Sequence, residues 1–233
     1  MNRIRLAASA AVFSVLFAGL TAMPSPAMAS GTHDHTEAES HAGHDHAHGH
    51  AHDADAERIY HGEFEDAEVR DRPLSDWGGD WQSVYSLLQD GTLDPVMAHK
   101  AETGDKSEDE YKAYYETGYR TDVDRIEIGR DSVTFHRGEA SVSARYESDG
   151  YEILTYEAGN RGVRFIFEKT EGDADAPQFI QFSDHRIAPS ASDHYHLYWG
   201  NDREALLSEV TNWPTYYPAA LSADAIVAEM IAH

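Results

Sequence analysis

The chain has 233 residues, no cysteine and a formal net charge of −24, from 18 Lys and Arg against 42 Asp and Glu. This negative excess argues against partners that are nucleic acids or anionic membrane surfaces. The lack of cysteine excludes disulfides and thiolate chemistry, so any metal must be bound by imidazole, carboxylate or carbonyl groups.

Residues 1–29 have the three parts of a secretory signal peptide. Arg3 and Arg5 make the start positive, residues 6–20 are mostly apolar, and Ala27-Met28-Ala29 is a small-x-small cleavage sequence. The apolar stretch is shorter than the roughly 20 apolar residues that span a bilayer comfortably. We therefore expect a periplasmic protein with no membrane insertion after cleavage.

Residues 30–59 lack the apolar bulk needed for a core, which predicts a disordered tail. The composition is rich in histidine, and such tracts are typical of metal binding. Many donors on a flexible chain predict loose binding of several ions, because ordering the tail costs entropy. Eight of the 15 histidines lie here: His33, His35, His41, His44, His46, His48, His50 and His52.

The rest of the chain, residues 60–233, is of a size for one globular domain. A first helix is predicted to begin at Ser75 or Asp76 and to end before Gly91, since its apolar residues recur at helical spacing. A second helix is predicted from a capping box at Ser107–Glu110 to Gly118. The stripe of the first helix consists of Trp77, Trp81, Val84, Tyr85 and Leu88.

After Val123 the apolar period changes from helical to alternating, which predicts successive short strands. Turns are expected at Asp149-Gly150, at residues 159–162 and at residues 172–173. Regular short strands with such turns favour an antiparallel barrel or sandwich. The strands are marked by Val133/Phe135, Val142/Ala144/Tyr146, Ile153/Thr155, Val163/Phe165/Phe167 and Phe179/Ile180/Phe182.

Helical spacing returns from Asp202 to Trp213. The following aromatic and proline-rich run, residues 213–218, predicts a rigid connector. Ser222 is then expected to cap a final helix that carries Ile226 and Met230. The domain is therefore predicted to be mainly β with attached helices.

The candidate metal site is the triplet His185, His194 and His196, placed at the last predicted strand pair. His194 and His196 are spaced i, i+2, so in a strand they point to the same face. A turn before them can fold His185 back alongside. Three imidazoles and one open position are typical of zinc.

The surroundings of this triplet leave alternatives open. Asp184 and Asp193 are either partners that orient a ring or ordinary turn and cap residues. The fourth metal position is open to water, a tail histidine, His233 of a neighbouring molecule or a carboxylate. The isolated histidines are interpreted as structural or surface residues: His61, His99 and His136.

Several long and unusual runs, spread over residues 62–233, resemble the ZinT (YodA) family of periplasmic zinc- and cadmium-binding proteins. The resemblance implies a calycin-like (lipocalin-type) antiparallel barrel with attached helices. It implies that His185, His194 and His196 hold the metal. The runs are Leu74–Tyr85, Leu93–Val96, Asp149–Tyr156, Gln181–His185, His194–His196, Gly200–Asp202 and Asn212–Pro218.

The resemblance also implies a function: zinc is captured and passed to the periplasmic zinc-binding component of a zinc ABC importer. Cd²⁺, Ni²⁺ and Cu²⁺ suit imidazole ligands as well, so the ligands alone do not choose the ion. Two alternatives remain. A three-histidine site with an open position also suits a zinc hydrolase or lyase, but no recognisable motif places a general base, so we do not expect an enzyme. An aromatic barrel also suits a small-molecule carrier.

Overall fold

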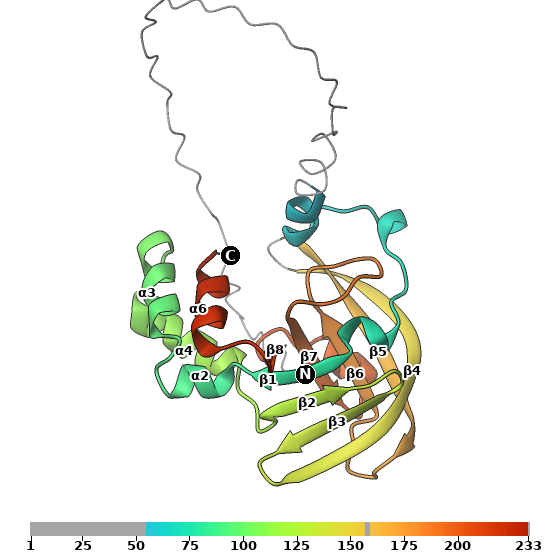
Figure 1. The fold of residues 1–233 in the computed structure, drawn as a ribbon. Coiled ribbons are helices and arrows are strands. Elements are labelled where there is room, and N and C mark those ends of the chain that lie inside the picture. The colour runs from blue at the N-terminus through green and yellow to red at the C-terminus, as the bar shows by residue number, and fades with distance from the viewer. Residues whose placement is uncertain (1–54, 157–158, 233) are drawn as a thin grey trace, which may run out of the picture.

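A computed structural model describes residues 55–156 and 159–232 (Figure 1). The predicted signal peptide and residues 30–54 of the predicted tail lie outside the described residues. Residues 55–60 are helical, so this helix precedes the predicted start of the globular domain. Ile59 packs against the hydrophobic core from this helix. Within the described residues, no helix has the length and apolarity to cross a bilayer.

Eight strands in the described part of the chain form a closed antiparallel barrel in which each strand pairs with the next. The barrel closes where β1 pairs with β8. This arrangement confirms the predicted antiparallel barrel. The strands are β1 Gly79–Ser83, β2 Arg125–Ile128, β3 Ser132–Arg137, β4 Ala140–Thr155, β5 Arg161–Gly172, β6 Phe179–Ser183, β7 Tyr195–Gly200 and β8 Thr215–Pro218.

The prediction of one helix between Ser75 and Gly91 is wrong. The segment contains a 3₁₀ turn, η2 (Leu74–Trp77), then strand β1, then the short helix α2 (Tyr85–Gln89). The turn ends at Gly78, whose ψ of 134° is no longer helical, and Gly79 then starts β1 with a φ of +143°. The apolar residues of this segment do not form one helical stripe. Trp77 and Trp81 belong to the barrel core, and Val84 and Leu88 belong to a second core among the helices.

The turn predicted at Asp149-Gly150 is also wrong, because β4 continues through it. Gly150 has a φ of +81°, and the pairing of β4 with β5 shifts register between Ser148 and Tyr151. The glycine therefore allows a β-bulge within a long strand instead of a chain reversal.

The remaining helices agree with the sequence in part. The capping box of Ser107 and Glu110 is present at the start of α4 (Glu108–Gly118), and α6 (Ala223–Ala232) follows Ser222 as predicted. Helix α5 spans only Arg203–Leu207, which is shorter than predicted. Helix α3 (Asp94–Thr103) was not predicted; its signal is a proline in the first turn, where the missing N–H costs nothing. The predicted rigid connector at residues 213–218 contains strand β8.

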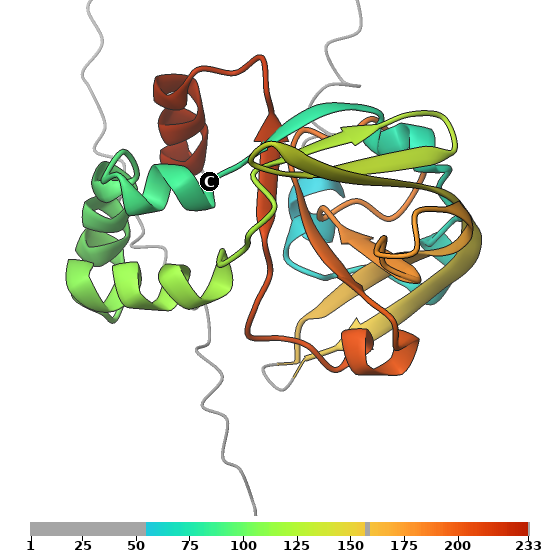
Figure 2. The same ribbon diagram turned by 90° about the horizontal axis from the view of Figure 1, so that it is seen from below.

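Two hydrophobic cores stabilise this arrangement. The barrel interior is filled by large side chains such as Trp77, which stacks on Phe182 at 4.5 Å between ring centroids. A second cluster joins α2, α3, α4 and α6, which gather beside the barrel (Figure 2). Burial of this apolar surface is the main stabilising term of both units. The filled interior argues against the small-molecule carrier, which needs a cavity of roughly 300 Å³ or more.

Candidate metal centre

The structure brings the three predicted histidines together at one end of strands β6 and β7. His185 lies two residues after β6, His194 directly precedes β7, and His196 lies on β7. Their ring centroids are 6.1 Å apart for His185 and His194, 5.8 Å for His185 and His196, and 6.3 Å for His194 and His196. The triplet is thus a compact cluster, although β8 and not β7 is the last strand of the barrel.

The histidine cluster faces the outside of the barrel. Tyr195 and Leu197 belong to the fully buried barrel core. Because side chains alternate along a strand, His194 and His196 lie on the opposite, outer face of β7. His194 stacks on Tyr217 of β8, with centroids 5.0 Å apart and planes 12° from parallel. The cluster therefore lies where the barrel meets the helical unit.

The imidazole of His196 is held by a hydroxyl group. Its Nδ1 is 2.7 Å from Oγ1 of Thr215, and that hydroxyl donates its one proton to the Trp213 carbonyl oxygen at 3.0 Å. The Thr215 oxygen must therefore accept from His196, which places the imidazole proton on Nδ1. Nε2 of His196 is left with its lone pair as the donor atom for a metal.

Burial and nearby positive groups keep His196 neutral. Burial lowers the pKa of His196 well below its ordinary value, and the charges that His185, His194 and Arg164 can carry lower it further. A neutral imidazole is the form that binds metal ions. Near neutral pH, protons therefore compete weakly for this ligand.

His194 lies next to a carboxylate from the helical unit. Nδ1 of His194 is 3.5 Å from Oε1 of Glu229, on helix α6. A carboxylate at Nδ1 orients the ring, favours a proton on that nitrogen and makes Nε2 the metal donor. Glu229 thus lies behind His194, at a longer distance than Thr215 behind His196.

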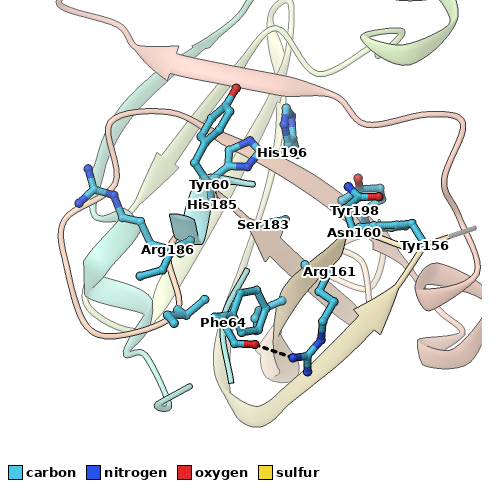
Figure 3. A pocket seen from close by; sticks show the side chains of 14 residues that line it. Tyr60, Phe64, Tyr156, Asn160, Arg161, Ser183, His185, Arg186, His196 and Tyr198 are labelled. Carbon is cyan, nitrogen blue, oxygen red and sulfur yellow. Dashed lines mark hydrogen bonds between the residues drawn. The ribbon is translucent and has the colours of Figure 1, made fainter. Parts of the chain in front are cut away.

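His185 has an unusual backbone conformation. Its φ is +60°, and it is the one non-glycine residue with positive φ in the described part of the chain. Such a conformation costs about 1–3 kcal/mol and persists only where the surroundings enforce it. Its ring lies against Tyr60, with centroids 4.4 Å apart, and both residues border a cavity of about 120 Å³ that His196 also lines (Figure 3).

The three rings are close to the spacing that a shared ion requires. Zn–N distances of about 2.0–2.1 Å in tetrahedral geometry place ring centroids about 5 Å apart. The rings in the structure would have to close by about 1 Å to reach that spacing. Consistent with this difference, no group of three His, Cys, Asp or Glu among the described residues is already arranged to hold a metal. Side-chain rotation covers such a distance.

The other candidate residues have different roles. Asp184 accepts a hydrogen bond from buried Arg72, and Asp193 is paired with Arg186, so the hydrogen bonds and ion pairs of both carboxylates involve arginines. His99 is on α3 and His136 is on β3, where it faces Glu127. His61 is exposed beside Tyr60.

Sequence reasoning missed Thr215, Tyr217, Glu229 and Tyr60. Thr215 and Tyr217 belong to the run Asn212–Pro218, whose β-branched and aromatic residues could have identified a strand. No local signal marks Glu229, because its place beside His194 depends on how α6 packs against the barrel.

A closed antiparallel barrel with helices packed on one side is a lipocalin-like fold, and the external imidazole cluster is what a metal-binding version of that fold would carry. The chain belongs to the ZinT (YodA) periplasmic lipocalin-like zinc-recruitment family, whose family model matches residues 55–233.

Relatives with solved or curated descriptions agree with this assignment. The chain is 59% identical over 178 residues to the probable metal-binding protein YrpE of Bacillus subtilis, covering 76% of this chain and 71% of YrpE. It is 50% identical over 177 residues to the zinc-binding lipoprotein AdcA of Streptococcus pneumoniae, covering 75% of this chain and 35% of AdcA. The chain therefore matches about a third of AdcA.

The crystal structure of the Zn(II)-bound ZinT-like domain of Streptococcus pneumoniae AdcA superposes with a TM-score of 0.72 at 50% identity, covering 74% of this chain and 97% of that domain. The family assignment confirms the expected lipocalin-type barrel, zinc as the ion of the family and an extracytoplasmic setting. Because the family recruits zinc and is not an enzyme family, it also confirms that the chain is not an enzyme and removes the hydrolase alternative.

Proposed function

We propose that the chain captures a zinc ion in the periplasm with His185, His194 and His196, and helps deliver it to a zinc ABC import system. The observation that carries this proposal is the convergence of the three rings, 5.8–6.3 Å apart, on one outer face of the barrel. His185 comes from the loop after β6 and the other two rings come from the start of β7, and packing alone does not require these segments to bring three imidazoles together.

The donor set suits zinc and similar ions. Three neutral imidazoles bind through nitrogen, and a fourth position remains for water or another small ligand. The cavity beside His185 and His196 gives that fourth ligand a place. Cd²⁺, Ni²⁺ and Cu²⁺ fit the same nitrogens, so the site is expected to bind them as well and selectivity must come from metal supply.

Support for delivery comes from the relatives. AdcA is named a zinc-binding lipoprotein, and the domain similar to this chain forms 35% of it. The similarity to one domain of a larger zinc-binding chain supports an interaction between this domain and a zinc-binding component. The proposed partner is the zinc-binding component of a zinc ABC importer.

The histidine-rich residues 30–54 complete the proposal. Their loose binding would raise the zinc concentration near the barrel, and the cluster would then hold one ion tightly. Release to a partner is favoured by the position of the cluster on the outer face of the barrel, where Tyr60 of the helix 55–60 and Glu229 of α6 lie beside it.

Zinc titration by calorimetry, against a competing chelator, tests this function. The chain from Ser30 and a version from Asp55 are compared, since the helix 55–60 contributes Tyr60 to the site. Both are expected to keep one tight site, and only the longer chain binds additional weak ions. A tight ion retained by His194→Ala/His196→Ala, in a folded barrel, would contradict the proposed ligands.

A further inference from the structure

Arg72 is fully buried beneath the loop that carries His185. Its side chain and that of Asp184 are both 0% exposed. Its Nη1 donates to Asp184 Oδ1 at 2.6 Å, its Nη2 donates to the Ser190 carbonyl oxygen at 2.7 Å, and its Nε donates to Asp76 Oδ2 at 3.0 Å. The guanidinium also lies over the Trp77 ring, 4.1 Å from its centroid. Its polar edges and one face are thus occupied.

These contacts join two segments that are distant in the chain. The loop at residues 184–194 connects β6 to β7, and hydrogen bonds with residues 70–76 hold it at four of its residues: Asp184, Ile187, Ser190 and Ser192. Arg72 holds it at Asp184 and at Ser190. Three further bonds come from the backbone of the two segments or from the Asp76 side chain: Arg70 N to Ile187 O, Ser190 N to Asp76 Oδ2 and Ser192 N to Asp76 O.

The same network enforces the backbone at His185. Asp184 Oδ1 accepts from the Arg186 N–H at 3.3 Å, so one carboxylate oxygen links the residues on either side of His185. Asp184 Oδ2 is buried and has no hydrogen-bond partner among the described residues. The carboxylate therefore depends on Arg72 for its charge partner. A left-handed residue that is not glycine persists only when its surroundings hold it so, and here Asp184 and Arg72 supply the surroundings.

We infer that Arg72 is a positioning residue for the metal centre: acting through Asp184, it fixes the direction of the His185 ring toward His194 and His196. The inference rests on the proposed function, because it assumes that His185 is a ligand. Arg72 itself does not touch the ion. Partners that orient a ligand are typically worth about 10–100-fold in metal affinity, and a loss of this size is expected when Arg72 is changed.

The test uses the full chain with Arg72→Lys. Lysine keeps the positive charge but lacks the planar fork that reaches Asp184, Ser190 and Asp76 together. The matched control is Val133→Ala, which removes buried volume from the barrel core on β3 without touching the loop. Both variants are expected to be less stable than the parent chain. Zinc affinity is measured by chelator competition, well below each unfolding temperature.

A second readout reports geometry directly. Bound Co²⁺ absorbs visible light strongly in tetrahedral sites and weakly in sites with a higher coordination number. Subtracting the spectrum of His194→Ala/His196→Ala removes the contribution of the tail histidines. Arg72→Lys is expected to lose about 10–100-fold in zinc affinity and to change the cobalt spectrum. Val133→Ala is expected to change neither.

The outcomes separate the two proposals. Parental affinity and spectrum in Arg72→Lys would overturn the positioning role and leave the three ligands in place. An equal loss of affinity in Val133→Ala would also overturn it, because the effect would then follow stability alone. A tight ion kept by His194→Ala/His196→Ala would overturn the proposed function itself. If Arg72→Lys does not fold, the isosteric Asp184→Asn replaces it, with the same expected direction and the same refuting result.

Discussion

Thr215→Val tests whether a single hydroxyl sets the donor atom of His196. Valine has nearly the shape of threonine but cannot accept a hydrogen bond. The Thr215 side chain is buried, and its oxygen is 2.7 Å from His196 Nδ1. The substitution would leave the Nδ1–H of His196 buried without an acceptor, and the ring would be free to rotate or to change tautomer.

The expected magnitude follows from these contacts. Leaving a buried donor without a partner costs about 1–3 kcal/mol of stability. Loss of a partner that orients a ligand lowers metal affinity by about 10–100-fold, or about 1.4–2.8 kcal/mol of binding free energy. Zinc affinity is measured by chelator competition, and stability is measured by urea unfolding in the presence of a strong chelator. Nitrogen-15 NMR of the imidazole reports the tautomer.

Thr215→Ser is the matched control, because it keeps the hydroxyl and loses only a methyl group. It is expected to keep the zinc affinity of the parent chain to within a few-fold. If Thr215→Val binds zinc as tightly as Thr215→Ser, the hydroxyl does not position His196 and the assignment of its tautomer is refuted.

Three further variants test His196, Glu229 and Gly150. Folding lowers the pKa of His196, so below a pH of about 6.5 the unfolded chain binds more protons than the folded chain. The free energy of unfolding should therefore fall as the pH drops below that value. In urea unfolding, His196→Gln should make this dependence of stability on pH less steep. Glu229→Gln removes the charge behind His194 and should weaken zinc binding by about 10-fold in the same competition assay, whereas unchanged affinity would exclude Glu229 as an orienting partner. Gly150→Ala meets no atom within 4 Å but must adopt a φ of +81°, so it should cost about 1–2 kcal/mol in urea unfolding and leave zinc affinity unchanged.

Part of the barrel could be predicted from the sequence because some of its strands alternate. On β3, Val133 and Phe135 belong to the buried core and Thr134 between them is less buried, so the period of two is plain. The Ser107 capping box identified α4 for a similar reason, since its two hydrogen bonds are made between residues three apart.

The wrong helix prediction between Ser75 and Gly91 occurred where one stretch of chain contributes to two cores. Trp77 and Trp81 pack inside the barrel, and Val84 and Leu88 pack in the helical unit. The two pairs follow one another in the sequence, and together their spacing resembles that of one helix. Sequence alone does not say which core each residue joins, since that depends on the pairing of β1 with β8 at the closure of the barrel.

Some residues of the candidate site could also be identified from the sequence, and others could not. The three histidines could be selected because their spacing is local and their side chains are the ones that bind metals. Arg72 and Glu229 could not be selected in this way. Each reaches the histidine-bearing segment from more than 30 residues away, through tertiary packing that leaves no periodic signal.

A crystal structure of the zinc-loaded chain, with anomalous scattering recorded at the zinc edge, shows whether His185, His194 and His196 together hold the ion. An anomalous peak is expected about 2.0–2.1 Å from one nitrogen of each ring, with Nε2 as the donor in His196. A tightly bound zinc peak elsewhere, with no peak among these three rings, would contradict this expectation.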